Sequence, residues 1–184
     1  MSTAAAGFTE GTFQRKLRDL NASQQCIQQL SLWLIHHRKH CPAIVKTWHR
    51  EFGKVPSPAR KLAFLYLAND VVQNTRKKYP EFTKEFGGIM KKVLEHLAVI
   101  TIDISTVKSI GRLLNIWKDR STFNPKVQAE LDRIWSTKQL EAKSEETAIS
   151  ADTASSTEAS PAKKAKKGNS GYIVYYLGYC FLVI

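Results

Sequence analysis

The stretch FLYLANDVVQNTRKK, residues 64–78, places polar side chains inside the most apolar part of the chain. An Asn-Asp pair follows Leu, Tyr and Ala, and a Gln-Asn pair comes one helical turn later. In a helix each residue turns the chain by about 100°, so side chains three, four, seven and eleven positions apart share one face. Tyr66 begins a series with this spacing, and Lys77 ends it.

These side chains fall within about 100° of arc on the predicted helix. We call them the polar strip: Tyr66, Asn69, Asp70, Gln73 and Lys77. The remaining arc is apolar, so we expect the helix to be packed on most sides and to present the strip as one wall of a groove. Amides donate and accept hydrogen bonds and a carboxylate accepts them, which suits an extended peptide ligand. A second interpretation is that Asn69 and Asp70 satisfy polar groups inside the domain.

Capping residues mark the beginnings of three helices. Ser23, Ser57 and Asn124 each precede a helical pattern, and proline occupies the first helical position after the last two. Further helical spacing is found over residues 12–20, 42–52, 80–100 and 105–119. No run before residue 170 alternates like a strand bounded by hairpin turns. The sequence therefore predicts an all-α domain of seven or eight helices that ends near residue 140.

The positive charge of the chain belongs to this predicted domain. The formal net charge is +12 over 184 residues, and residues 1–140 hold 23 Lys and Arg against 11 Asp and Glu. A basic domain favours an anionic partner, such as nucleic acid, a membrane surface or a phosphorylated peptide.

A second polar series lies on the predicted helix 105–119 and the residue that follows it. Arg112, Ile116 and Arg120 are spaced at four-residue intervals, so an apolar side chain stands between two guanidinium groups. Arginine is suited to bidentate capture of phosphate. Two arginines on a helix surface are more often simply solvated, so their value depends on whether this helix lies beside the polar strip.

The C-terminal part changes composition twice. Residues 141–170 are read as a disordered linker, because Ser, Thr, Ala and Glu cannot repay the entropy of ordering. This linker contains a basic cluster that resembles a nuclear-import signal: Lys163, Lys164, Lys166 and Lys167. Residues 171–184 are apolar and of unassigned role; as a helix they would cover only about 20 Å, too short for a transmembrane anchor.

Cysteine usage and the N-terminus favour a reducing compartment, either cytosol or nucleus. The chain has three cysteines and its first residues lack the pattern of a secretory signal. His36, His40 and Cys41 invite a metal interpretation, but no second pair of ligands completes a zinc site, so no metal or other cofactor is expected. No nucleophile, base and orienting residue occur in a recognisable motif, and the protein is not expected to be an enzyme.

Four segments carry a family resemblance: SQQCIQQLSLWLIHHRKH, KLAFLYLANDVVQN, PEFTKEF and GRLLNIWKDRS. They resemble the CTD-interacting domain (CID), the module that binds the C-terminal repeat domain of RNA polymerase II, and within it the regulation-of-nuclear-pre-mRNA-domain (RPRD) proteins. The resemblance covers about residues 10–140. It implies a right-handed superhelix of about eight helices, related to the VHS and ENTH folds. It also implies a nuclear protein that links transcription to pre-mRNA processing or to a phosphatase acting on the repeat domain.

The resemblance also implies roles for the strip residues. Asp70 would accept a hydrogen bond from the tyrosine hydroxyl of a heptad Tyr-Ser-Pro-Thr-Ser-Pro-Ser, and Asn69 would hold a peptide carbonyl. Tyr66 and Ile116 would supply an apolar wall. Arg112 would meet a phosphoserine. Further groove positions and a supplementary cation are implied at Gln24, Asn74 and Arg120. The family continues into a coiled coil that dimerises, and dimerisation through that region is not expected from the tail of this chain.

Two other binding functions remain open at this point. A lipid-headgroup or cargo adaptor on the related VHS or ENTH scaffold would use the same basic surface and would be indifferent to Asp70. RNA binding would rest on net charge. The aromatic residues suited to base stacking are expected in the core, which disfavours it.

Overall fold

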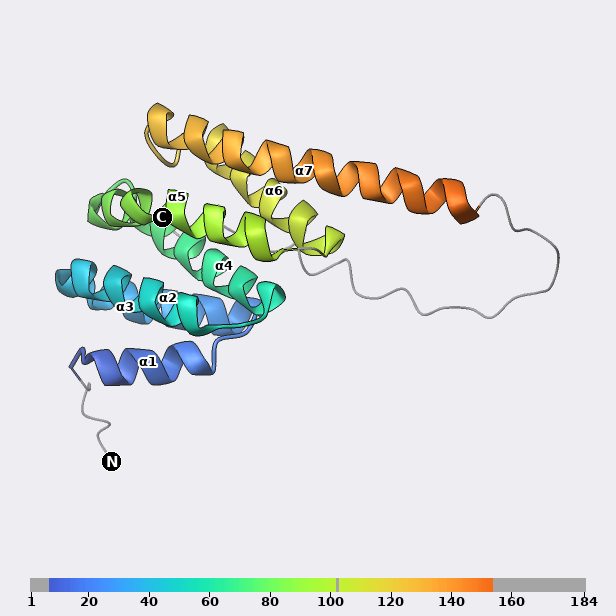
Figure 1. Cartoon of the computed structure of the whole chain (residues 1–184). Coiled ribbons are helices and arrows are strands. Elements are labelled where there is room, and N and C mark those ends of the chain that lie inside the picture. Colours follow the sequence, from blue (N-terminus) through green and yellow to red (C-terminus); the bar gives the residue numbers. More distant parts are fainter. Residues whose placement is uncertain (1–6, 102, 154–184) are drawn as a thin grey trace.

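The structure, a computed structural model, describes residues 7–101 and 103–153, with side chains described as far as residue 144 (Figure 1). Its described part is helical throughout and contains no strand, which confirms the predicted all-α superhelical class. The helices are α1 (Glu10–Arg18), α2 (Gln24–His36), α3 (Cys41–Lys54), α4 (Pro58–Thr75), α5 (Glu81–Ile100), α6 (Ile104–Asp119) and α7 (Pro125–Thr153), with a short 3₁₀ helix, η1 (Arg38–His40), before α3.

The three predicted caps are confirmed. The hydroxyls of Ser23 and Ser57 accept hydrogen bonds from backbone N–H groups in the first turns of α2 and α4, and Asn124 Oδ1 accepts from the N–H of Val127 at 2.9 Å. Two further caps begin α1, where the Thr9 hydroxyl accepts from the N–H of Thr12 at 3.1 Å, and α6, where the Asp103 carboxylate accepts from the N–H of Thr106 at 2.8 Å. Each cap satisfies a backbone donor that has no partner within its helix.

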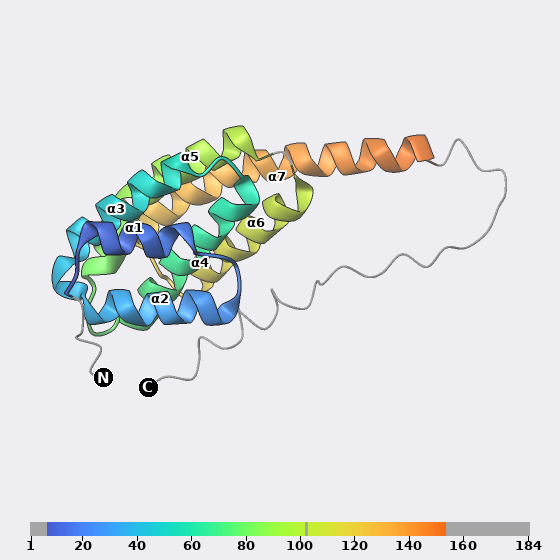
Figure 2. The ribbon, with the colours of Figure 1, turned by 90° about the horizontal axis from the view of Figure 1, so that it is seen from below.

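The helices form two layers. In one layer α1 packs on α3, α3 on α5, and α5 on α7; in the other, α2 packs on α4 and α4 on α6. Figure 2, seen from below, shows α2, α4 and α6 on one side of the molecule and α3, α5 and α7 on the other. This alternation of successive helices between two layers places α4 in the middle of its own layer.

The central position of α4 explains its composition. Every residue from Lys61 to Val72 is buried, because α2 and α6 flank the helix and α5 and α3 cover its back. Even the Lys61 ammonium is enclosed, where it donates to the Phe52 carbonyl oxygen at 2.5 Å and lies 4.2 Å from the centre of the Phe52 ring. The expectation that α4 presents the whole strip as an open wall is therefore wrong for its first part: Tyr66, Asn69 and Asp70 are buried.

The last helix differs from the predicted boundary near residue 140. α7 continues to Thr153, so the segment 141–153 is helical where a disordered linker is predicted. Glu, Ala and Lys are good helix formers, and a helix that is already nucleated is extended at little cost. The remaining linker, the four lysines at 163–167 and the apolar segment 171–184 lie outside the described residues.

The histidine-rich segment at the end of α2 takes part in packing. His40 stacks on Phe8, and a His37 ring nitrogen is hydrogen-bonded to the Trp33 carbonyl oxygen at 2.7 Å. Burial, with Glu85 and Glu81 nearby, raises the pKa of Cys41 to about 12, so its thiol stays protonated at neutral pH. The described residues contain no cluster of three potential metal ligands. None of the described helices is both long and apolar enough to cross a bilayer.

Candidate functional site

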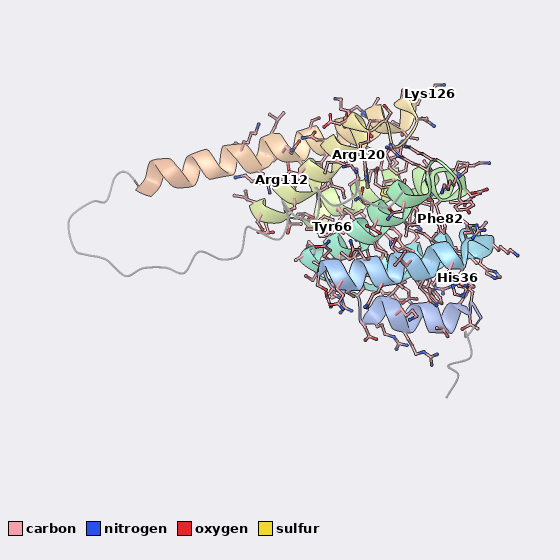
Figure 3. The ribbon with its side chains drawn as sticks, turned by 180° about the vertical axis from the view of Figure 1, so that it is seen from behind. His36, Tyr66, Phe82, Arg112, Arg120 and Lys126 are labelled. Atoms are coloured by element: carbon pink, nitrogen blue, oxygen red, sulfur yellow. The ribbon has the colours of Figure 1, made fainter. Side chains whose placement is uncertain are left out.

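The polar strip lies where three parallel helices meet. Along α2 and α4, Ser31 lies by Asp70 and, further on, the Arg38 guanidinium covers the Tyr79 ring at 4.2 Å. Along α4 and α6, Asn69 meets Trp117 and Gln73 meets Arg120. Residue numbers rise together in both comparisons, so α2, α4 and α6 run in the same direction. Figure 3 shows Tyr66, Arg112 and Arg120 on the face that these helices share.

Tyr66 occupies the N-terminal part of the strip. Its side chain is buried, and burial raises the pKa of its phenol above the ordinary value. The Ser109 hydroxyl and the Arg112 guanidinium, both on α6, oppose this rise in pKa. Arg112 itself is exposed. Arg112, the residue predicted to bind a phosphate, therefore lies at the surface beside the strip, as the prediction for α6 requires.

Asp70 lies one turn further along α4 and is 6% exposed. Burial raises the pKa of its carboxyl group above the ordinary value, because desolvation penalises the charged form. The nearby Ser31 hydroxyl and the Asn74 amide oppose this rise, and the Asn74 amide donates to Asp70 Oδ2 at 3.0 Å. A carboxylate can accept about four hydrogen bonds. These two neighbours therefore leave acceptor capacity for a ligand hydroxyl.

Asn69 has a structural function. Its Oδ1 atom accepts a hydrogen bond from Trp117 Nε1 at 2.9 Å, and its side chain is 2% exposed. This bond ties the centre of α4 to a fully buried tryptophan of α6. The side-chain oxygen of Asn69 thus satisfies a polar group inside the domain, as the second interpretation of the strip expects. A hydrogen bond from its amide nitrogen to a peptide stays a prediction.

Gln73 joins α4 to the end of α6. Its amide nitrogen donates to Thr122 Oγ1 at 2.8 Å, and its oxygen faces Arg120 Nη1 at 3.5 Å. Arg76 in turn donates to the Arg120 carbonyl oxygen at 2.5 Å. Arg120 is half-buried and held along the strip, whereas Arg112 projects outward. The two arginines predicted to bind phosphate therefore differ in how far their side chains are held by neighbouring residues.

The remaining predicted residues are distributed along the same face. Asn74 is exposed near the end of α4 and Lys77 just beyond that end, and Ile116 is half-buried on α6 between the two arginines. Gln24 is half-buried at the first position of α2, and the parallel packing of α2 and α4 places it toward the N-terminal half of α4. The structure thus brings α4 and α6 residues together at Tyr66 and Asn69, with Asp70 next to them on α4.

Sequence reasoning missed the polar residues that neighbouring helices contribute. Ser31 interrupts the apolar run of α2, as the polar strip interrupts α4, and this interruption could have indicated it. Ser109 and Thr122 carry no such signal, because each lies among ordinary polar residues. Their role follows only from contacts between helices.

Electrostatics and geometry together define what this site can do. An acceptor carboxylate lies in surroundings that are largely closed to water, next to an apolar and aromatic surface, with an exposed guanidinium on the adjacent helix. This arrangement suits a ligand that carries a hydroxyl on an apolar ring and an anionic group nearby.

Comparison with known proteins assigns the family. The model of the CID domain matches residues 11–131, which include every member of the site. Human regulation of nuclear pre-mRNA domain-containing protein 1A is 48% identical over 126 residues, covering 68% of this chain and 40% of that protein. For human protein 1B the identity is 51% over 118 residues, covering 64% and 36%. CID domain-containing protein 1 of Caenorhabditis elegans is 34% identical over 120 residues, covering 65% and 38%.

The matched region coincides with the helical domain described above, and the chain spans about 40% of the length of the first of these relatives. The predicted resemblance is therefore confirmed: this chain belongs to the CID domain family, with relatives among the regulation of nuclear pre-mRNA domain-containing proteins.

Proposed function

We propose that this domain is a non-enzymatic module that binds phosphorylated heptad repeats of the RNA polymerase II C-terminal domain. The observation that carries the proposal is the buried Asp70 carboxylate one helical turn from Tyr66, which has the exposed Arg112 guanidinium beside it. The heptad offers a tyrosine hydroxyl and, after modification, a phosphate on the following serine. Membership of the CID family supports the choice of this ligand.

Asp70 is suited to recognise the heptad tyrosine. Its carboxylate is already desolvated in the free protein, so part of the cost of burying it is met before the ligand arrives. A phenol hydroxyl then supplies a hydrogen bond that water can hardly supply at this depth. Because a hydrogen bond to a charged acceptor is stronger in surroundings of low polarity, a phenylalanine in place of the heptad tyrosine is expected to bind poorly.

Arg112 is suited to recognise the phosphate. It is exposed, so a phosphorylated side chain can reach it without displacing a helix. A guanidinium binds phosphate through two parallel N–H donors. The greater negative charge of a phosphate and its third acceptor oxygen favour phosphoserine over a carboxylate mimic. Arg120 lies further along α6 and has part of its guanidinium directed at Gln73. Its contribution is expected to be smaller.

The cellular setting is part of the same proposal. The printed names of the relatives refer to regulation of nuclear pre-mRNA, and the lysines at 163–167 resemble an import signal. We infer a nuclear protein that connects the polymerase tail with pre-mRNA processing or with a phosphatase acting on that tail.

Fluorescence anisotropy with a labelled two-repeat peptide tests the proposal. Asp70→Asn and Arg112→Ala should each weaken the serine-phosphorylated peptide by roughly 1.5 to 3 kcal/mol, about 10- to 100-fold. Arg112→Ala should change the affinity for the unmodified peptide far less. Arg133→Ala removes an exposed arginine from α7 and is the matched control. If neither substitution in the site changes the affinity, the proposal is wrong.

A further inference from the structure

A cavity of about 780 Å³ lies beyond the C-terminal end of the polar strip. It is enclosed by the end of α4, the first half of α5, and the loop that joins α6 to α7. In Figure 3 Arg120 lies between Tyr66 and Lys126, near the beginning of α7, which locates this end of the molecule. We call it the basic cavity, and its lining residues are Arg76, Lys77, Pro80, Thr83, Lys84, Gly87, Gly88, Ser121, Thr122, Phe123, Asn124 and Val127.

The basic cavity has one sign of charge. Arg76, Lys77 and Lys84 line it, and its lining contains no Asp or Glu. The nearest acidic residues on the same helix, Glu81 and Glu85, line a neighbouring cavity of about 420 Å³, and Lys84 borders both cavities. A concave surface lined by one sign of charge concentrates ligands of the opposite sign. The basic cavity therefore fits an anion.

The wall of the basic cavity contains an aromatic ring, Phe123, and two glycines without side chains, Gly87 and Gly88. Phe123 packs against α5 because Gly87 has no side chain; a Cβ atom there would lie 3.3 Å from the ring. A Cβ atom at Gly88 would meet nothing within 4 Å, so the glycine pair leaves the cavity wall open. Thr83 Oγ1 is buried without a hydrogen-bond partner in the described part of the chain.

The basic cavity is continuous with the polar strip. Lys77 belongs to both, and Gln73 of the strip donates to Thr122 of the cavity wall. Arg76 uses one donor on the Arg120 carbonyl oxygen, and a guanidinium has five. From Tyr66, which lies beside Arg112, to Lys77 just beyond α4 the helical rise is about 16 Å, which an extended peptide covers in about five residues.

We propose that the basic cavity is a second phosphate subsite for the same peptide, so that the domain prefers peptides phosphorylated at two positions. A phosphorylated serine or threonine about five or more residues from the one at Arg112 would place its phosphate between Arg76 and Lys84. An adjacent proline would pack on Phe123. This inference rests on the proposed function and deepens it.

Anisotropy with three labelled two-repeat peptides tests the subsite, using unmodified, singly phosphorylated and doubly phosphorylated forms. The wild-type protein should bind the doubly phosphorylated peptide about three- to tenfold more tightly than the singly phosphorylated one. Lys84→Gln should weaken the doubly phosphorylated peptide about two- to fivefold and leave the singly phosphorylated one unchanged. Lys92→Gln removes an exposed lysine from the same helix outside the cavity, and it should change neither.

Gly88 gives a second test that does not depend on losing a lysine. Gly88→Glu and Gly88→Gln add side chains of equal size to an open position and differ in charge. Gly88→Glu should weaken the doubly phosphorylated peptide at least threefold more than Gly88→Gln does. Equal affinities for the two variants would overturn the subsite, because the cavity would then be insensitive to charge.

The two proposals fail in different ways. If the subsite is wrong and the proposed function right, Arg112→Ala weakens both phosphorylated peptides while Lys84→Gln behaves like Lys92→Gln. If the proposed function is wrong, Asp70→Asn and Arg112→Ala leave the singly phosphorylated peptide unaffected. That result would overturn the subsite as well, since it requires the peptide to lie on the strip.

Discussion

The buried carboxylate of Asp70 costs folding stability, and in the proposed function it is the group that binds the heptad tyrosine. This carboxylate is buried with Ser31 of α2 and Asn74 of α4 nearby, and these two polar groups offset only part of the desolvation, so its pKa remains raised. A carboxyl group with a raised pKa in the folded state stabilises the protein below the pKa of the unfolded chain, about 4. That contribution is lost as the pH rises through the higher folded-state pKa. At neutral pH the ionised group is therefore a cost to folding.

We expect Asp70→Asn to raise the free energy of unfolding at pH 7, by about 0.5 to 2 kcal/mol, while it weakens peptide binding. The gain should shrink as the pH falls toward 4, because wild-type Asp70 is then protonated as well. Urea unfolding at several pH values measures this, with Glu95→Gln, an exposed position on α5, as control. A variant that is less stable at pH 7 would show that Ser31 and Asn74 outweigh the cost of burial.

Asn69 is expected to act on stability first. Asn69→Ala leaves Trp117 Nε1 buried without its acceptor, which should cost about 1 to 3 kcal/mol of the free energy of unfolding. Asn115→Ala changes the same residue type at an exposed position of α6 and should stay within about 0.5 kcal/mol of wild type. Urea denaturation followed by tryptophan fluorescence measures both. Unchanged stability with lost peptide binding would instead assign Asn69 to the ligand.

At this scale the sequence predicted which residues share a helix face, but their partners on other helices were beyond its reach. Periodicity placed Asn69, Asp70 and Gln73 on one side of α4. It could not show that Asn69 is bonded to Trp117, 48 positions away, or Gln73 to Arg120, 47 positions away. Burial of Asp70 is likewise a property of packing between helices. The role of one strip residue in folding and of the next in binding therefore could not be separated in advance.

Among the helices, α7 combines two parts with different relations to the core. Its first part supplies Leu131 and Trp135, both fully buried, and Trp135 Nε1 donates to the Val107 carbonyl oxygen of α6 at 3.2 Å. Its last turns extend beyond the ends of α5 and α6 in both views (Figures 1 and 2). The first part of α7 is therefore held by packing against the domain. The last turns are held by continuing the same helix.

We expect a chain that ends after Ser144 to keep the urea midpoint of the full chain, with lower helical content by circular dichroism. Trp135→Ala should cost about 3 to 5 kcal/mol of the free energy of unfolding, since it removes a large buried side chain and one hydrogen bond. Unfolding curves of the two variants, compared with the full chain, measure the difference. A large loss of stability in the shortened chain would show that residues beyond 144 pack against the domain.

Helix beginnings were predictable and one helix end was not, for a physical reason. A cap such as Ser23, Ser57 or Asn124 is a local signal, because one side chain bonds a backbone group two or three residues away. The end of α7 has no comparable stop signal near residue 140, and no glycine or proline occurs between 126 and 160. Composition alone then suggested a linker where the helix continues.

For the whole molecule, the main alternative is a lipid or cargo adaptor that uses the same basic surface. Attraction to an anionic membrane is a summed field effect and weakens as salt screens it. Recognition of a peptide at Asp70 is a local contact in a buried place, and salt screens it much less. The two functions therefore differ in how salt and single substitutions act on binding.

We expect the affinity ratio between wild type and Asp70→Asn for the phosphorylated peptide to stay nearly constant from about 0.05 to about 0.5 M salt. The ratio for Arg112→Ala should shrink over that range, because Arg112 is exposed. Anisotropy titrations measure both ratios. Binding to phosphatidylserine vesicles that exceeds peptide binding and does not respond to Asp70→Asn would favour the adaptor.

The parallel direction of α2, α4 and α6 has a consequence for any bound chain. Three helix beginnings lie toward one end of the face and three helix ends toward the other, so the backbone dipoles add along it. Arg38, Arg76 and Lys77 stand at or just beyond the helix ends, where cations compensate the negative pole. The face is therefore polarised from end to end. A ligand with the same side chains in reversed order would meet the opposite field, so the field itself favours one direction of the bound peptide.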